Sequence, residues 1–210
     1  MQPWLSIIVP TIGRSTLTRM VASITDPSVE IVVVADTYHG DVDEDLARAR
    51  NAVRGRVRWF DHDAGYHAWG QPQRQFGMTQ ARGHWLMFSQ DDNVLLPDAL
   101  SHIAQTIRAQ PHPRPLLFQV DNWQAGVVWK VPAIVQGNVD ADCIVTPNVA
   151  SGLGRWGDRN EGDYDFILAT SRLWPDGAFI RHVIARSPER DPLTRHAMSA
   201  AWTRPGAVVS

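Results

Sequence analysis

The chain has 210 residues, of which 44% are hydrophobic and 20% charged, and its formal net charge at pH 7 is -2. This composition is ordinary for a folded globular protein and excludes an intrinsically disordered chain. The near-neutral charge gives no indication of a nucleic-acid partner. No apolar run reaches the roughly 20 residues that a membrane-spanning helix needs, and the N-terminus lacks the pattern of a signal peptide. We therefore expect a cytoplasmic protein without a membrane span, and the single cysteine excludes a disulfide framework.

The first half of the chain predicts alternating strands and helices. Apolar, β-branched runs at 5–9 and 29–35 are typical of buried parallel strands, and residues 15–24 between them carry apolar side chains at helical spacing. Strand, helix and strand in this order form a right-handed crossover unit. We predict further helices at 43–53, 71–81 and 95–109, and further strands at 57–60, 85–88 and 116–120. From residue 121 the pattern changes to short strands, at 127–131 and 143–145. The fold class is therefore α/β, a Rossmann-like open mixed sheet flanked by helices in a single domain.

An acidic cluster follows the apolar strand predicted at 85–88. The strand ends at Ser89 and is followed by Gln90, Asp91, Asp92 and Asn93. Oxygen ligands of this kind suit Mg²⁺ or Mn²⁺, and Mg²⁺ in proteins commonly bridges carboxylates to phosphate oxygens. The cluster therefore suggests a phosphate-bearing substrate. The alternative, of equal weight on these residues alone, is that the cluster caps the helix that begins near residue 97.

Other polar residues also follow the ends of predicted strands. Pro10 and Thr11 follow the first strand, and Asp36 follows the second. Ligands of open α/β sheets bind beyond the carboxyl ends of the strands, so we expect Asp36 and Asp92 to share one cavity. Taken by itself, Asp36 fits better a turn in which the carboxylate accepts from its own backbone.

A second acidic segment lies at 161–166. A carboxylate here, such as Asp163, can take a proton from an incoming hydroxyl if the fold brings it to the same edge of the sheet. The alternative is that Asp163 caps the helix predicted by the apolar residues that follow it.

Taken in order, these segments resemble an inverting glycosyltransferase of family 2, which has the GT-A fold. The segments that carry the resemblance are 6–11 with Arg14, 32–36, 73–83, 88–100 and 161–166. The resemblance implies a nucleoside-diphosphate sugar as donor. It also implies that residues 1–120 form the half that binds this donor and residues 121–210 the acceptor-side half of the same domain. The acceptor stays unidentified.

The resemblance assigns a role to each matching donor-side residue. Pro10, Thr11 and Asp36 would hold the nucleobase and the ribose. Arg14 and Arg74 would lie beside the donor.

The segment 90–92 takes the place of the D-x-D motif of the family. Asp92 would be the principal contact of Mn²⁺ or Mg²⁺, and Asp91 would touch the ribose. His182 is the candidate for a late histidine that completes the metal shell. Gln90 departs from the motif because an amide stands where the first carboxylate is expected, which puts metal dependence in doubt.

The resemblance also assigns the catalytic base. Asp163 falls where the family keeps this carboxylate, with Gly162 in place of the usual preceding glutamate, and Glu161 is a nearby rival. The implied reaction is metal-dependent, inverting transfer of a sugar to an acceptor hydroxyl. Two other functions stay open: a nucleotide-sugar-binding module that has lost catalysis, suggested by Gln90, and a sugar nucleotidyltransferase. The lysine-free loop 11–15 argues against the nucleotidyltransferase.

Overall fold

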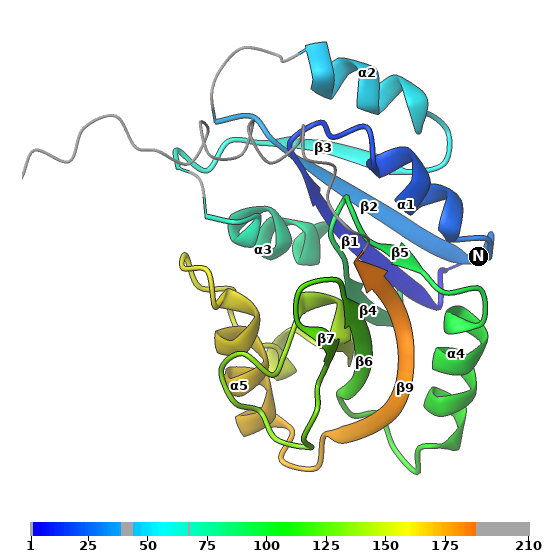
Figure 1. The fold of residues 1–210 in the computed structure, drawn as a ribbon, viewed down its shortest axis with the longest axis vertical. Helices are drawn as coiled ribbons and strands as arrows, with labels where there is room; N and C mark the ends of the chain where they lie inside the picture. The colour runs from blue at the N-terminus through cyan, green and yellow to red at the C-terminus, as the bar shows by residue number, and fades with distance from the viewer. Residues whose placement is uncertain (1, 39–43, 67, 188–210) are drawn as a thin grey trace, which may run out of the picture.

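The computed structural model describes residues 2–38, 44–66 and 68–187, which form five α-helices, two short 3₁₀ turns and nine strands (Figure 1). Strands and helices alternate through the first half, as predicted. The strands are β1 (Leu5–Thr11), β2 (Val29–Asp36), β3 (Arg58–His62), β4 (Trp85–Phe88), β5 (Val94–Leu95), β6 (Leu116–Asn122), β7 (Gly126–Val128), β8 (Ile144–Pro147) and β9 (Ala178–Ser187). The helices are α1 (Leu17–Ser23), α2 (Glu44–Ala52), α3 (Gln71–Gln80), α4 (Ala99–Ala109) and α5 (Gly162–Leu173), with 3₁₀ turns η1 (Ala141–Cys143) and η2 (Ala150–Gly152).

The described strands form one mixed sheet. Its order is β3-β2-β1-β4-β8-β6-β9-β5, and β7 pairs with β6. Strands β1 to β4 run parallel to their neighbours within this group. Beyond β4 the directions are mixed: β8 is antiparallel to both β4 and β6, β9 is parallel to β6, and β5 is antiparallel to β9. The predicted fold class, an open mixed α/β sheet in one domain, is confirmed.

Helices cover the sheet from both sides. Helices α1 and α4 lie along one side, and α3 and α5 lie along the other (Figure 1). Leu5, Ile7, Ile8 and Val9 of β1 are consequently fully buried. A strand covered on both faces needs apolar side chains at consecutive positions, so its sequence is a continuous apolar run rather than an alternating one.

The structure moves several predicted boundaries. The helix predicted from residue 95 begins at Ala99, because Val94 and Leu95 instead form β5 and pair with β9. The strand predicted at 127–131 ends at Val128, and the next residue, Trp129, has a φ of 75°, which an extended strand does not permit. The first difference arises from pairing with a segment that is distant in the sequence, and the second from the backbone conformation of Trp129.

Strand β9 was not predicted. It is ten residues long and pairs with both β6 and β5, so it closes the second half of the sheet. The proline-rich tail that follows it lies outside the described residues. Among the described residues, no helix combines the length and apolar character needed to cross a bilayer.

Candidate active site

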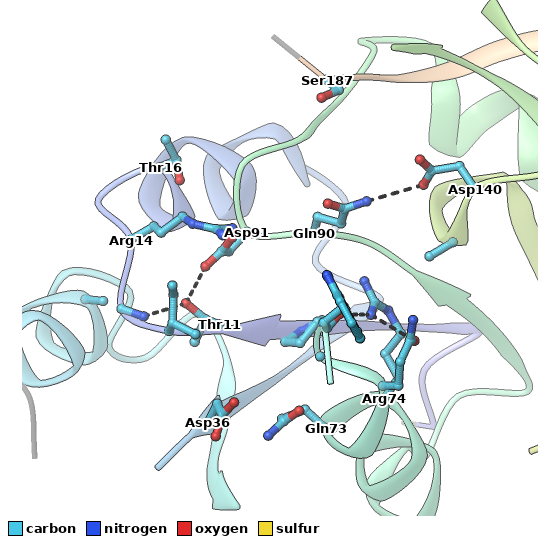
Figure 2. A pocket seen from close by; sticks show the side chains of 18 of the residues that line it. Thr11, Arg14, Thr16, Asp36, Gln73, Arg74, Gln90, Asp91, Asp140 and Ser187 are labelled. Atoms are coloured by element: carbon cyan, nitrogen blue, oxygen red, sulfur yellow. Dashed lines mark hydrogen bonds and ion pairs between the residues drawn. The ribbon is translucent and has the colours of Figure 1, made fainter. Parts of the chain in front are cut away.

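One cavity of about 950 Å³ opens where the parallel strands end (Figure 2). This is the edge at which open α/β sheets bind ligands, because carboxyl ends of parallel strands meet there. The cavity is lined by most of the residues singled out in the sequence: Pro10, Thr11, Arg14, Asp36, Arg74, Gln90, Asp91, Glu161 and Asp163. The expected convergence of distant segments therefore takes place. Asp36 shares the cavity with Asp91 rather than with Asp92.

At one wall of the cavity, three residues form a bonded cluster. Thr11 Oγ1 donates a hydrogen bond to Asp91 Oδ2 at 2.7 Å, and Arg14 Nη1 lies 2.5 Å from Asp91 Oδ1 (Figure 2). Asp91 is 2% exposed. Its burial raises the pKa of the Asp91 carboxyl, and the charge of Arg14 opposes that shift. Both oxygens of Asp91 are thus engaged by the segment that follows β1.

Asp36 ends β2 and lines the cavity beside a residue that the sequence did not single out. Its Oδ1 accepts from the backbone N–H of Tyr38 at 3.2 Å, so the turn predicted as an alternative is also present. Gln73 of α3 lines the same cavity, and Figure 2 shows its amide on the same side as Asp36. Gln73 is fully buried, and its amide nitrogen and oxygen have no hydrogen-bond partner among the described residues. Its place immediately before Arg74 was the only signal available in the sequence.

Arg74 is a buried cation that lines the cavity and contacts the loop before α3. Its Nη1 donates to the carbonyl oxygen of Trp69 at 2.9 Å, and its guanidinium lies 5.2 Å from the ring centre of Trp156. Burial lowers the pKa of Arg74, and the charge of Asp142 opposes that shift. Trp69 has a φ of 52°, an uncommon and strained conformation for so large a side chain. Arg74 therefore binds the backbone of Trp69, a half-exposed residue that also lines the cavity.

Two further carboxylates, those of Asp163 and Asp140, line the cavity. Asp163 is in the first turn of α5, and its Oδ1 accepts from the backbone N–H of Tyr164 at 2.7 Å. Burial, and next the nearby charge of Asp140, raise the pKa of Asp163 to about 6. Asp140 was not predicted. Its Oδ1 lies 3.5 Å from Gln90 Nε2, so it stands beside the position where the family motif would have an acid (Figure 2).

Helix α5 presents its first residues to the cavity. Glu161 immediately precedes the helix and lines the cavity, and its Oε1 accepts from Gln136 Nε2 at 3.1 Å. A Cβ atom on Gly162 would lie 2.6 Å from the Gln71 side chain. A larger residue at position 162 would therefore require the Gln71 side chain to move.

The residues expected to hold a metal ion do not meet. Asp92 is 8% exposed and is not among the described residues that line the cavity, and its Oδ2 lies 3.7 Å from Arg14 Nη1. His182 stands within β9, where its Nε2 lies 3.2 Å from Asp98 Oδ2 and its ring stacks on His102. Within the described part of the chain, no group of three histidine, cysteine or acidic side chains is arranged to hold an ion. Of the segment 90–92, only Gln90 and Asp91 are among the described residues that line the cavity, and His182 pairs with Asp98 instead, so the metal roles expected of Asp92 and His182 stay predictions.

Comparison with known proteins identifies the family. The model of glycosyl transferase family 2 matches residues 6–118, more than half of the chain. The chain belongs to glycosyl transferase family 2. The resemblance drawn from the sequence is thereby confirmed. A search of curated proteins found no match.

Solved structures share the fold of this family 2 chain. S. aureus TarS 1-349 superimposes with a TM-score of 0.65 at 17% identity, covering 89% of this chain and 60% of TarS 1-349. TarS 1-349 in complex with UDP-GlcNAc gives 0.62 at 16% identity, covering 91% and 59%. The mannosyltransferase PcManGT from Pyrobaculum calidifontis, in complex with GDP-Man and Mn²⁺, gives 0.62 at 13% identity, covering 95% and 61%. The chain thus spans about 60% of the length of these proteins, and identities this low show the fold alone.

Proposed function

We propose that this protein transfers a sugar from a nucleoside-diphosphate sugar to an acceptor hydroxyl. The observation that carries the proposal is that one cavity is lined both by the ends of β1 and β2 and by Asp163, a carboxyl with a pKa of about 6, in a chain of family 2. Perturbed carboxyls in clefts are typical of catalytic sites. The UDP-GlcNAc and GDP-Man complexes of TarS and PcManGT support this class of donor.

The two halves of the chain would serve the two substrates. The nucleotide end of the cavity is formed by the first half, where Thr11, Asp36 and Gln73 supply hydroxyl, carboxylate and amide groups to a nucleoside. The other end is formed largely by the second half, which contributes Asp140 and Asp163. A cavity of this volume is of the size that small-molecule sites commonly have.

In the proposed reaction Asp163 is the general base. Its carboxylate takes the proton of the acceptor hydroxyl while the acceptor oxygen forms a bond to the anomeric carbon. The bond from that carbon to the diphosphate breaks, and its electron pair stays on the departing diphosphate oxygen. Attack opposite to the leaving group inverts the anomeric configuration. A pKa of about 6 suits this role, because the carboxyl is mainly ionised near pH 7 yet remains a stronger base than an ordinary aspartate.

No step of this reaction is assigned to a metal ion. PcManGT is in complex with Mn²⁺. In this chain the D-x-D position begins with Gln90, and Asp91 is engaged by Thr11 and Arg14. The charge of the leaving diphosphate is therefore assigned to side chains that line the cavity.

A nucleotide-sugar-binding module without catalysis is the second candidate, and Gln90 is the observation that favours it. Against it stands Asp163, because a binding module has no need of a carboxyl whose ionisation is opposed by burial and by Asp140. Turnover of the sugar donor distinguishes the two candidate functions, because only the transferase would consume it.

The test combines binding with turnover. Thermal shift with UDP and with GDP should raise the melting temperature for the cognate nucleotide, since a ligand that binds only the folded state stabilises it. Hydrolysis or transfer is then measured with the sugars of that nucleotide, beginning with UDP-GlcNAc or GDP-Man. Asp163→Asn should keep the thermal shift and lose turnover. Binding without turnover in the wild type would favour the module, and neither binding nor turnover would reject the proposal.

A further inference from the structure

Arg14 places a positive charge beside the carboxylates of the segment 90–92. Arg14 Nη1 lies 2.5 Å from Asp91 Oδ1 (Figure 2) and 3.7 Å from Asp92 Oδ2, so the guanidinium is close to both carboxylates of the segment 90–92. The Asp91 and Asp92 side chains are 2% and 10% exposed, whereas that of Arg14 is 21% exposed. Of these three side chains, that of Arg14 is the most exposed to solvent.

The carboxylates of this segment already have a positive charge beside them. Asp91 uses Oδ1 for Arg14 and Oδ2 for Thr11. Gln90 is neutral and its amide faces Asp140 at 3.5 Å. A divalent ion that bound here would have to displace a guanidinium from a buried carboxylate, which breaks a buried ion pair, or would have to sit against that like charge.

The guanidinium of Arg14 stays positively charged in the folded protein. Burial alone would lower the pKa of Arg14, but Asp91 and, to a smaller extent, Asp92 outweigh it, and the pKa of Arg14 is raised. The guanidinium is therefore a fixed positive charge at every pH at which the protein is folded.

The position of Arg14 suits a diphosphate. It follows the carboxyl end of β1 and lines the same cavity as Asp36, Gln90 and Asp91. A planar guanidinium binds phosphate oxygens with paired N–H donors, and such charge-assisted hydrogen bonds are stronger than neutral ones.

We propose that Arg14, anchored by Asp91, neutralises the leaving diphosphate in place of a divalent metal ion, so that this enzyme binds and uses its donor without metal. The inference rests on the proposed nucleotide-sugar function and adds to it the identity of the cationic group. When the bond to the anomeric carbon breaks, the electron pair passes to a diphosphate oxygen beside Arg14. The only cation that this step requires belongs to the chain itself.

The first experiment uses the wild-type protein and needs no variant. Calorimetric titration with the cognate nucleotide, UDP or GDP, is carried out in EDTA and again in Mn²⁺, followed by donor hydrolysis under both conditions. Electron paramagnetic resonance measures Mn²⁺ binding to the protein without nucleotide. We expect nucleotide affinity and turnover to be retained in EDTA, and no Mn²⁺ site in the nucleotide-free protein.

Variants then test the role of Arg14 itself. Arg14→Ala removes the charge and should weaken nucleotide binding in EDTA by roughly 10-fold to 100-fold, the loss of one hydrogen bond to a charged group. It should also release the carboxylates, so that the variant acquires Mn²⁺ binding and its nucleotide affinity recovers in Mn²⁺. Arg14→Lys keeps the charge without the paired donors and should fall between these two proteins.

Arg19→Ala is the matched control. Arg19 is a neighbouring arginine whose Nη2 lies 3.4 Å from the backbone oxygen of Asp92, and it is not among the described residues that line the cavity. This variant should bind nucleotide in EDTA as the wild type does. An equal loss in Arg19→Ala and Arg14→Ala would show that general surface charge, rather than Arg14, holds the diphosphate, and would overturn the inference.

The outcomes separate this inference from the proposed function. A wild type that binds nucleotide and turns over donor only with Mn²⁺ keeps the proposed function and overturns the role of Arg14. A wild type that binds neither nucleotide under either condition overturns both. Retention in EDTA, together with Mn²⁺ rescue of Arg14→Ala, supports both.

Discussion

Replacing Asp163 with asparagine should abolish transfer and yet stabilise the fold at neutral pH. Asparagine has the same shape and keeps an oxygen that accepts from the Tyr164 N–H, but it cannot take a proton. In the wild type, burial and then Asp140 raise the pKa of Asp163 from 3.8 to about 6. At neutral pH the folded protein therefore holds a carboxylate in surroundings that favour the neutral acid.

The sign of the effect follows from comparing the folded and unfolded chains. The unfolded chain ionises Asp163 near its ordinary pKa of 3.8, so ionisation favours unfolding as the pH rises from 3.8 to 6. One pKa unit corresponds to about 1.4 kcal/mol, so the penalty on the folded state reaches at most about 3 kcal/mol above pH 6. Near pH 5 the penalty is about half as large. The asparagine variant avoids the penalty, and its advantage should shrink as the pH is lowered.

Urea unfolding at about pH 7.5 and about pH 5 measures the free energy of unfolding of both proteins. Asp165→Asn is the matched control on the same helix. Its carboxylate is bonded to Arg159 at 2.5 and 2.6 Å, which lowers the pKa of Asp165, so this replacement should cost stability at about pH 7.5 instead of adding it. An Asp163→Asn protein that is less stable than the wild type at both pH values, or that still transfers sugar, would refute the reasoning.

The remaining predictions concern the surroundings of the base and the entry to α3. Asp140 raises and Arg74 lowers the pKa of Asp163. Asp140→Asn should therefore move the titration of the Asp163 carboxyl, followed by NMR, to lower pH, and Arg74→Gln should move it to higher pH. Shifts in the same direction for both variants would contradict this assignment. In the wild type, kcat/KM should fall about tenfold per pH unit below about pH 6, and a rate independent of pH there would exclude Asp163 as the base. Gly70→Ala places a Cβ 2.7 Å from a proline ring at a φ of 79°, so thermal unfolding should show a loss beyond that of Gly55→Ala, which has the same φ and open space. The backbone strain costs roughly 1–2 kcal/mol in either variant and the collision roughly 1–3 kcal/mol more, and equal losses would show that the proline ring yields.

The sequence by itself determined the first half of the sheet and its ligand-binding edge. The runs at 5–9 and 29–35 are continuous and apolar because their strands are buried on both faces, and this burial leaves its mark locally in the sequence. Residues placed just after such strands, including Thr11 and Asp36, must lie at the carboxyl edge whatever the rest of the chain does. The family followed from the same motifs and is confirmed.

The partners of those residues depended on the tertiary structure. Nothing in the local sequence distinguishes Asp140 from any other loop aspartate, and it enters the site only because β8 and β6 are inserted into the sheet beside β4. The two carboxylates after β4 look alike in the sequence, yet Asp91 faces the cavity and Asp92 does not line it among the described residues. His182 was expected at the metal and instead pairs with Asp98, because β9 carries it past α4. Local sequence records whether a segment is buried, whereas the contacts of a charged side chain depend on which distant segments the fold brings to it.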